Sequence, residues 1–255
     1  MKNSRKVRII SLFNQAGGVG KSTLTMNLGY HLAISDKRVL LIDLDPQASL
    51  TLFMGLAPNQ IEKTIKNSIL DKEPLPICTL HGMDLVPSNI LFSAAEQQLS
   101  SILRGESRLK QALSPIKNNY DFILIDSPPT LGILSILGLV ASDYVLIPSQ
   151  THFKSTQGTD LVLNSIAEVR QVLEHDLKIA GLIPNLYTKG TIQDLEALEF
   201  LKSQLAPITK VYPPIPRSTA FADASQERQP LAVYNSRHPA VTILDGIAKD
   251  LEELL

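Results

Sequence analysis

The chain has 255 residues, a formal net charge of −1, 44% hydrophobic residues and a single cysteine, Cys78. No apolar run approaches the ~20 residues that a membrane-spanning helix needs, the apolar run after the basic N-terminus is too short for a signal peptide, and one cysteine excludes an internal disulfide. We therefore expect one cytoplasmic α/β domain that spans residues 1–255, in which any affinity for nucleic acid must come from a local patch of cations.

Apolar, β-branched runs alternate with helical patterns along the chain, which predicts a parallel sheet with right-handed crossovers. Near-continuous apolar runs such as 39–42 and 122–125 indicate strands that are covered on both faces. We therefore predict three layers, with helices on both faces of a mostly parallel, twisted sheet. The predicted strands are 7–13, 38–42, 122–125, 144–147, 179–184 and a short one near 209–212; the predicted helices are 20–34, 57–70, 92–103, 107–116, 132–141, 155–175, 191–205 and 239–254; and residues 71–90 are expected to be irregular with one short extra strand.

The first strand-to-helix turn, residues 14–23, carries the most informative motif. Its sequence, Asn-Gln-Ala-Gly-Gly-Val-Gly-Lys-Ser-Thr, lies between a strand-like and a helix-like run, which is the context of a phosphate-binding P-loop. Glycines let successive N–H groups point at one anion, and the helix N-terminus adds partial positive charge. Lys21 is expected to reach the β- and γ-phosphates, and the Ser22 hydroxyl to ligate Mg²⁺. The predicted nucleotide-binding residues of the loop are Gly17, Gly18, Val19, Gly20, Lys21, Ser22 and Thr23.

Two acidic motifs follow predicted strands. Residues 43–47 read Asp-Leu-Asp-Pro-Gln, and four apolar residues precede Asp126 in the pattern of a Walker B strand. Ligands of an open α/β sheet bind outside the carboxyl ends of its strands, so both motifs should converge on the P-loop. Asp126 is expected to bind Mg²⁺ through water. Taken alone, each motif is also compatible with an ordinary turn or strand end.

Together these motifs resemble the ParA/MinD family of ATPases, a deviant Walker subclass of the P-loop NTPases. The strict P-loop has glycine where this chain has Gln15, and Asp-x-Asp-Pro-Gln is typical of ParA proteins. The resemblance implies slow, Mg²⁺-dependent ATP hydrolysis, with Lys21 and Asp45 as catalytic residues. Asp45 would orient the attacking water and contact the Mg²⁺ shell, with Asp43 supporting the site. By the same resemblance, Asn185 and Pro216 would contact the adenine.

The chain departs from most of the family at Ala16. ParA-like proteins usually carry a signature lysine there, which reaches across a nucleotide-sandwich dimer to the ATP of the partner. Carboxysome-positioning ATPases of the family lack this lysine, and the chain resembles them in that respect. Either the charge supplied in trans is absent or another cation supplies it. Because two facing ATP molecules concentrate negative charge, we expect such a cation, with Lys154 the first candidate and Lys189 the second. A solvated lysine is the alternative for Lys154.

Three functions are compatible with these motifs. The first is a DNA- or cargo-positioning ATPase, the second a MinD-like membrane ATPase, and the third a metabolic enzyme on the same scaffold. Residues 243–255 have a mainly acidic polar face, which anionic lipid would repel, so no membrane partner is expected. An iron–sulfur cluster shared by two subunits needs cysteine thiolates in suitable places, and Cys78 is far from them. No motif for a second substrate is present.

The DNA prediction rests on residues 202–238, which contain five cations and two acids. Phosphate contacts need no base readout, so a dimer could bind DNA without a recognition motif. A solvated face is the alternative for each cation. We expect an ATP-dependent homodimer, associated with the nucleoid, that works with a ParB-like or carboxysome adaptor; a plasmid or chromosome partition protein, or an orphan ParA with another cargo, is the alternative. The expected DNA-binding residues are Arg217, Arg228 and Arg237.

Overall fold

The structure is a computed structural model that describes residues 7–151, 153–172 and 175–254, and of residues 153–160 it gives the backbone alone. In the described chain, seven strands form one sheet in the order β3-β4-β2-β5-β1-β6-β7, and every neighbouring pair is parallel except the β3–β4 hairpin at one edge. The strands are β1 (Arg8–Leu12), β2 (Val39–Asp43), β3 (Cys78–Leu80), β4 (Met83–Val86), β5 (Phe122–Asp126), β6 (Tyr144–Gln150) and β7 (Lys178–Asn185).

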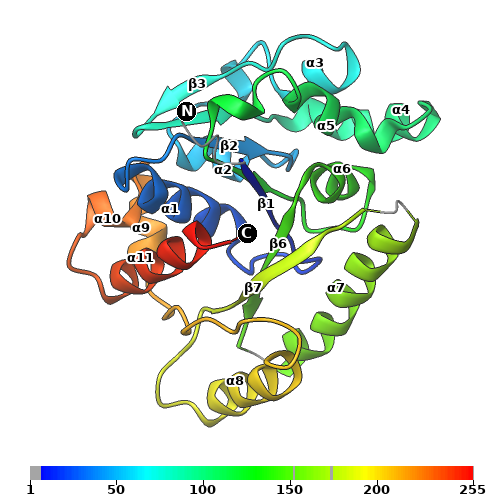
Figure 1. Cartoon of the computed structure of the whole chain (residues 1–255). Coiled ribbons are helices and arrows are strands. Elements are labelled where there is room, and N and C mark those ends of the chain that lie inside the picture. Colours follow the sequence, from blue (N-terminus) through cyan, green and yellow to red (C-terminus); the bar gives the residue numbers. More distant parts are fainter. Residues whose placement is uncertain (1–6, 152, 173–174, 255) are drawn as a thin grey trace, which may run out of the picture.

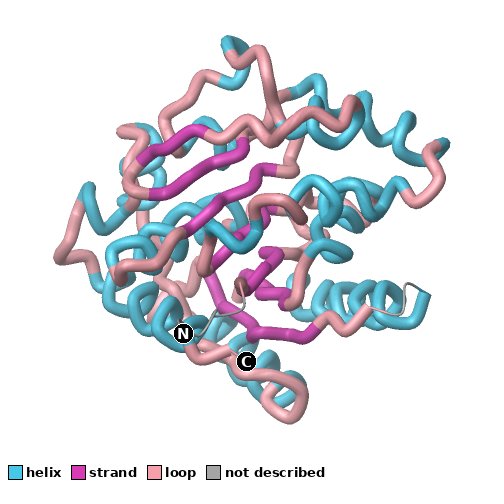
Figure 2. The backbone as a smooth tube through the Cα atoms, turned by 45° about the horizontal axis from the view of Figure 1, so that its top comes forward, coloured by secondary structure: helices cyan, strands magenta, loops and turns pink. Residues whose placement is uncertain are grey.

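Helices cover both faces of this sheet (Figure 2). The first face packs on α1, α2, α9, α10 and α11, and the second on the helices from α3 to α8. Helix α11 lies directly beside α1 (Figure 1). The helices are α1 (Lys21–Ile34), α2 (Ser49–Phe53), α3 (Ile65–Leu70), α4 (Ala95–Ser101), α5 (Arg108–Leu113), α6 (Ile133–Ala141), α7 (Phe153–Val172), α8 (Ile192–Leu205), α9 (Ala220–Gln226), α10 (Leu231–Tyr234) and α11 (Pro239–Glu252).

The apolar strands bury side chains on both faces because successive side chains of a strand point in opposite directions. In β2, Leu41 packs in the core under α1, whereas Leu40 and Ile42 pack in the core under α3 to α6. In β5, Leu124 faces the first core and Ile125 the second. The three-layer, mostly parallel arrangement predicted from these runs is confirmed.

Several predicted boundaries were wrong for local reasons. The helix predicted over 57–70 begins only at Ile65, because Thr64 and Asn67 form a capping box there. The strand predicted near 209–212 is reduced to one bridge between Val211 and Leu182, since the prolines that follow at 213 and 214 cannot donate to a ladder. The irregular stretch 71–90 contains two short strands instead of one.

The parallel strands place the ends of β1, β2 and β5 at one edge, where Asp43 of β2 is the register partner of Asp126 of β5, and Asp126 is also the partner of Leu12 in β1. The loop after β1 leads into α1 at the same edge. Among the described residues, no helix is long and apolar enough to cross a membrane.

Candidate functional site

The P-loop curls tightly between β1 and α1. Gly18 and Gly20 have left-handed backbone angles, with φ of +71° and +92°, which L side chains rarely adopt. A Cβ on Gly20 would lie 2.3 Å from the Asn185 side-chain nitrogen. Gly20 also caps α1 without a side-chain hydrogen bond, so the amides of the first helical turn keep their capacity to bind an anion.

Side-chain amides from the neighbouring strand ends hold the loop in place. Asn185, the last residue of β7, donates to the carbonyl oxygen of Val19 at 2.8 Å. Gln150, the last residue of β6, donates to that of Gly18 at 2.9 Å. The family resemblance implied Asn185 for the nucleotide site, but Gln150 was missed, because the strand predicted from the sequence ended at residue 147 and the observed one continues to Gln150.

Lys21 is buried between the loop and the acidic motifs. Its Nζ donates to the carbonyl oxygens of Asn14 and Ala16, at 2.9 and 3.0 Å. Burial lowers the pKa of Lys21, while the carboxylates of Asp126 and Asp45 raise it. The structure therefore brings the P-loop lysine and both predicted acidic residues to one place.

Asp43 is fully buried and holds the turn that follows β2. Its Oδ2 accepts hydrogen bonds from the Thr51 amide at 2.9 Å and from the Thr51 hydroxyl at 2.7 Å, and its Oδ1 accepts from the Asp45 amide at 3.0 Å. Burial raises the pKa of Asp43 to about 7 against the effect of these donors. Both carboxylate oxygens are engaged with the protein, which fits a supporting role.

Asp45 and Asp126 differ from Asp43 in having acceptor capacity left. Asp45 uses Oδ1 to accept from the Gln47 amide at 2.9 Å, and burial raises its pKa while Lys21 lowers it. Asp126 is fully buried, and neither of its oxygens makes a hydrogen bond to a described residue. Burial and the charge of Asp43 raise the pKa of Asp126, whereas the neighbouring Ser22 hydroxyl and Lys21 lower it.

This donor set fits a magnesium ion. A buried carboxylate whose oxygens make no hydrogen bond is stabilised by a bound cation or its water, and hydroxyl and carboxylate oxygens are the ligands that Mg²⁺ prefers. No cluster of three or more His, Cys, Asp or Glu side chains forms a closed metal cage in the described part of the chain. Mg²⁺ usually needs only one or two carboxylates together with substrate phosphates, so Ser22, Asp45 and Asp126 are a sufficient set.

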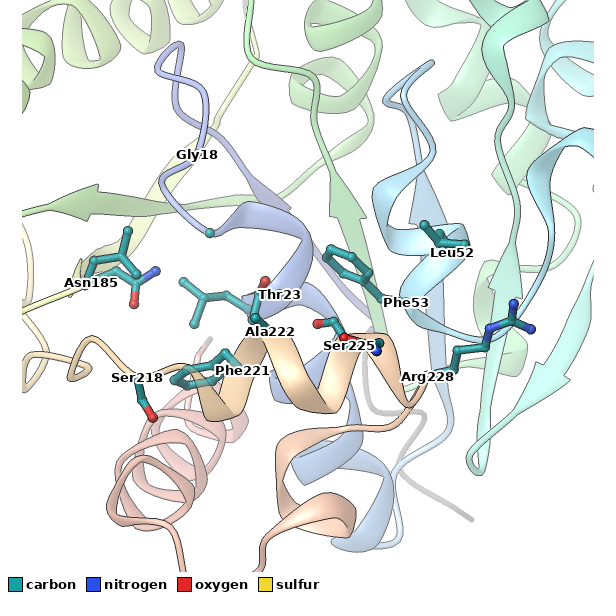
Figure 3. Close-up of a pocket in the computed structure, with 14 residues that line it drawn as sticks. Gly18, Thr23, Leu52, Phe53, Asn185, Ser218, Phe221, Ala222, Ser225 and Arg228 are labelled. Carbon is teal, nitrogen blue, oxygen red and sulfur yellow. The ribbon is translucent and has the colours of Figure 1, made fainter.

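A cavity of about 630 Å³ opens beside the P-loop, a size typical of small-molecule sites. Thr23 and Asn185 line it near the loop, Phe221 and Ser225 of α9 line one side, and Phe53 of α2 lies across from them (Figure 3). Pro216 does not line this cavity, although its backbone forms a bridge with Tyr187 just after β7.

Helices α2 and α9, which both line the cavity, were not predicted from the sequence, because they are too short to show a helical period. The lining residues are Gly18, Gly20, Thr23, Leu24, Leu52, Phe53, Asn185, Leu186, Ser218, Phe221, Ala222, Ser225, Gln226 and Arg228.

The predicted DNA-contacting arginines are all exposed but do not form one group. His238 and Ser218 are joined by a hydrogen bond of 3.0 Å, which brings the chain neighbours Arg237 and Arg217 to the same region. Arg228 instead lies at the far end of the cavity, where its guanidinium contacts the Gly55 carbonyl oxygen at 3.4 Å (Figure 3).

The lysines on which the DNA and dimer predictions rest differ in what the structure shows of them. Of the five cations counted between 202 and 238, Lys202 and Lys210 form ion pairs with Glu199 and Asp250. Lys154 stands in the first turn of α7, but its side chain lies outside the described residues.

Comparisons with known proteins agree with this geometry. Residues 7–179 match a family model described as "AAA domain". The sporulation initiation inhibitor protein Soj of Bacillus subtilis is 34% identical over 96% of this chain and 98% of its own length. The chromosome partitioning protein ParA of Caulobacter vibrioides is 30% identical over 91% of this chain and 89% of its own.

Solved structures show the same fold with nucleotide. An aspartate-to-alanine variant of McdA from Cyanothece, in complex with ATP, superposes with a TM-score of 0.88 at 26% identity, over 98% of this chain and 99% of the other. A protein described as cobyrinic acid a,c-diamide synthase from Mycobacterium smegmatis, with bound ATP analog and magnesium, gives 0.79 at 33% identity, over 87% and 92%.

Substitution of the P-loop glycines tests the loop geometry. Gly20→Ala places a methyl group against the Asn185 amide in a left-handed backbone, so we expect the free energy of unfolding to fall by about 1–3 kcal/mol. Gly17→Ala is the matched control, because its Cβ would meet nothing nearer than the Pro129 Cβ at 3.9 Å. Urea unfolding without nucleotide measures both; equal losses in the two variants would contradict the geometry.

Proposed function

The chain belongs to the ParA/MinD family of P-loop ATPases, and from this premise we propose that it is an ATP-dependent positioning or partitioning ATPase acting as one domain over residues 1–255. The observation that carries the proposal is the meeting of Lys21 with the Asp45 and Asp126 carboxylates beneath a glycine-rich loop. Relatives of the same fold bind ATP, or an ATP analog with magnesium, so ATP and Mg²⁺ are the proposed ligands here.

The residues of the site have different roles in phosphoryl transfer, whose catalysis is mostly positioning and charge neutralisation. Loop amides from Gly17 to Thr23 would bind the phosphates, and Ser22 and Asp126 would hold Mg²⁺, which neutralises developing charge when bound. Lys21 turns from the loop carbonyls to the phosphates. Asp45 keeps an acceptor oxygen with which to orient the attacking water. Asn185, which lines the cavity, and Pro216, which lies outside its lining two residues before Ser218, would contact the adenine, as the family resemblance implies.

Asp45→Ala tests the catalytic assignment. We expect ATP affinity to be kept and turnover to fall by about 100-fold or more, the usual effect of losing a group that positions or deprotonates a nucleophile. Phosphate release measures turnover, and fluorescent ATP titration measures affinity. The control Asp71→Ala removes an exposed carboxylate after α3 and should hydrolyse ATP like the wild type. Wild-type turnover in Asp45→Ala would remove the assignment.

We propose that the active form is an ATP-dependent homodimer, as the family resemblance implies. The position of the signature lysine is Ala16, so a different cation must offset the charge of two facing nucleotides. Lys154 is the second residue of α7, the helix that follows β6, and the end of β6 contacts the P-loop through Gln150. A lysine at this junction has the reach to serve as a point charge for phosphates across the dimer.

Lys154→Ala is expected to abolish the ATP dimer while leaving a folded monomer that binds ATP. Size-exclusion chromatography with light scattering, in ATP and in ADP, separates the two states. Lys178→Ala, which removes an exposed lysine at the start of β7, is the control and should dimerise normally. A Lys154→Ala protein that dimerises as well as the wild type would transfer the role to Lys189 or exclude a trans-acting lysine.

We propose that the dimer binds DNA without sequence preference. The support is the joining of the Arg217 and Arg237 regions by the Ser218–His238 hydrogen bond, together with the exposure of both arginines. Two such patches in one dimer would double the area that can bind phosphates. Arg228 lies apart, beside the cavity, so its contribution is tested separately.

Charge reversal measures this DNA affinity. Arg217→Glu or Arg237→Glu should weaken ATP-dependent binding equally on unrelated sequences and reduce the salt slope by about 0.9 for each phosphate that the protein no longer neutralises. Arg104→Glu, which changes an exposed arginine beyond α4, is the control and should bind normally. Binding of equal strength without nucleotide, or none with ATP, would contradict the proposal.

The proposed cargo is a carboxysome or another large assembly, reached through a ParB-like or carboxysome adaptor protein. Its support is the missing signature lysine and the McdA fold match; chromosome or plasmid partition is the alternative favoured by the names of Soj and ParA. Stimulation of ATP hydrolysis by purified adaptors of each class distinguishes them. A metabolic synthetase, as the name of one structural relative suggests, would show no link between dimer state and DNA.

A further inference from the structure

Gln15, which stands where the strict P-loop pattern has glycine, ties the loop to helix α7. Its Nε2 donates to the Ser165 hydroxyl at 2.8 Å and approaches the Leu161 carbonyl oxygen at 3.4 Å. Ser165 is buried, and its own hydroxyl donates to the Leu161 carbonyl oxygen at 2.8 Å. The hydroxyl oxygen is thus used as donor and acceptor at once, in an arrangement that glycine at position 15 could not make.

The loop has two further bonds to the same part of the fold. The Asn14 side chain donates to the Pro148 carbonyl oxygen in β6 at 2.7 Å, and Gln150 donates to Gly18 from the end of β6. Helix α7 begins three residues after Gln150 and runs beside the sheet (Figure 1). The P-loop is therefore fastened to the β6–α7 unit at residues 14, 15 and 18.

Hydrogen bonds to β7 and α8 hold the junction between β6 and α7 in place. Thr151 is fully buried; its amide donates to the Asn185 carbonyl oxygen at 3.3 Å and its hydroxyl donates to the Asp194 carboxylate. Asp194, in the first turn of α8, also accepts from the Thr191 hydroxyl at 2.5 Å. Because the start of α7 is held in this way, a displacement of Gln15 would be taken up farther along α7 and not at the junction.

Nucleotide binding would change the hydrogen bonds of the segment that carries Gln15. Lys21 now donates to the carbonyl oxygens of Asn14 and Ala16, the two residues that flank Gln15. When Lys21 turns to phosphate oxygens, both carbonyls lose their donor. The segment then has different interactions in the two states, which is what a ligand needs to shift a conformational equilibrium.

We propose that Gln15 is a positioning residue that couples occupancy of the P-loop to the position of α7 beyond its first turn, from Leu161 onward. The inference rests on the proposed function, because it requires a nucleotide at the P-loop. It gives the Gln15–Ser165 hydrogen bond a regulatory role: the state of the phosphate site is transmitted to the helix that we assign to the dimer contact.

Hydrogen exchange with and without Mg·ATP tests the coupling. In the wild type, ATP should change the exchange rate of the α7 amides over residues 161–172 by at least about fivefold, the lower end of typical coupling between sites. Gln15→Ala and Ser165→Ala should each still bind ATP but lose this change. The double variant should be no worse than either single one, since both remove the same bond.

Two further variants separate this role from general destabilisation. Ser165→Thr keeps the hydroxyl and should retain the ATP response, and Gln171→Ala removes an exposed glutamine of the same helix and should behave as the wild type. A wild-type ATP response of α7 in Gln15→Ala, or ATP binding by the wild type without any change in α7, would overturn the coupling. A wild type that does not bind ATP would contradict the proposed function, and the coupling with it.

Discussion

One buried ammonium group among buried carboxylates governs the site. Lys21 is 7% exposed and lies between the carbonyl oxygens of the P-loop and the carboxylates of Asp45 and Asp126. A charge out of water is costly unless it is paired and hydrogen-bonded, so the lysine, the loop and the strand ends constrain one another. The left-handed glycines, the parallel register of β2 with β5, and the amides of Gln150 and Asn185 all serve to hold these groups at one edge of the sheet.

Much of this arrangement could be predicted from the sequence because its signals are local. Apolar runs such as 122–125 indicate buried parallel strands, and the Gly-rich turn before Lys21 indicates a phosphate loop. The carboxyl ends of parallel strands share one edge, so Asp43, Asp45 and Asp126 could be placed together without coordinates. The structure adds how these carboxylates differ. Both oxygens of Asp43 accept hydrogen bonds, from Thr51 and from the Asp45 amide, whereas neither oxygen of Asp126 makes a hydrogen bond to a described residue.

The remaining features depend on contacts between distant parts of the chain. Helix α9 forms one side of the cavity, yet its seven residues carry too little periodicity to reveal it. The bond of Gln15 to Ser165 joins residues 150 positions apart, and the bond of Gln150 to Gly18 joins residues 132 apart. No single-sequence pattern encodes such pairs. The same holds for the cation surplus near the C-terminus, where the structure shows Lys202 and Lys210 in ion pairs and separates Arg228 from the other arginines.

The central claim is that this edge of the sheet binds a nucleotide through its phosphates and that the buried Lys21 charge is essential for it. Calorimetric titration of the wild type and of Lys21→Met with Mg·ATP and with adenosine tests it directly, since methionine keeps the apolar stem and removes only the charge. We expect the wild type to bind Mg·ATP far more tightly than adenosine and Lys21→Met to lose this preference. Equal affinities of the wild type for the two ligands, or an unchanged preference in Lys21→Met, would contradict the claim.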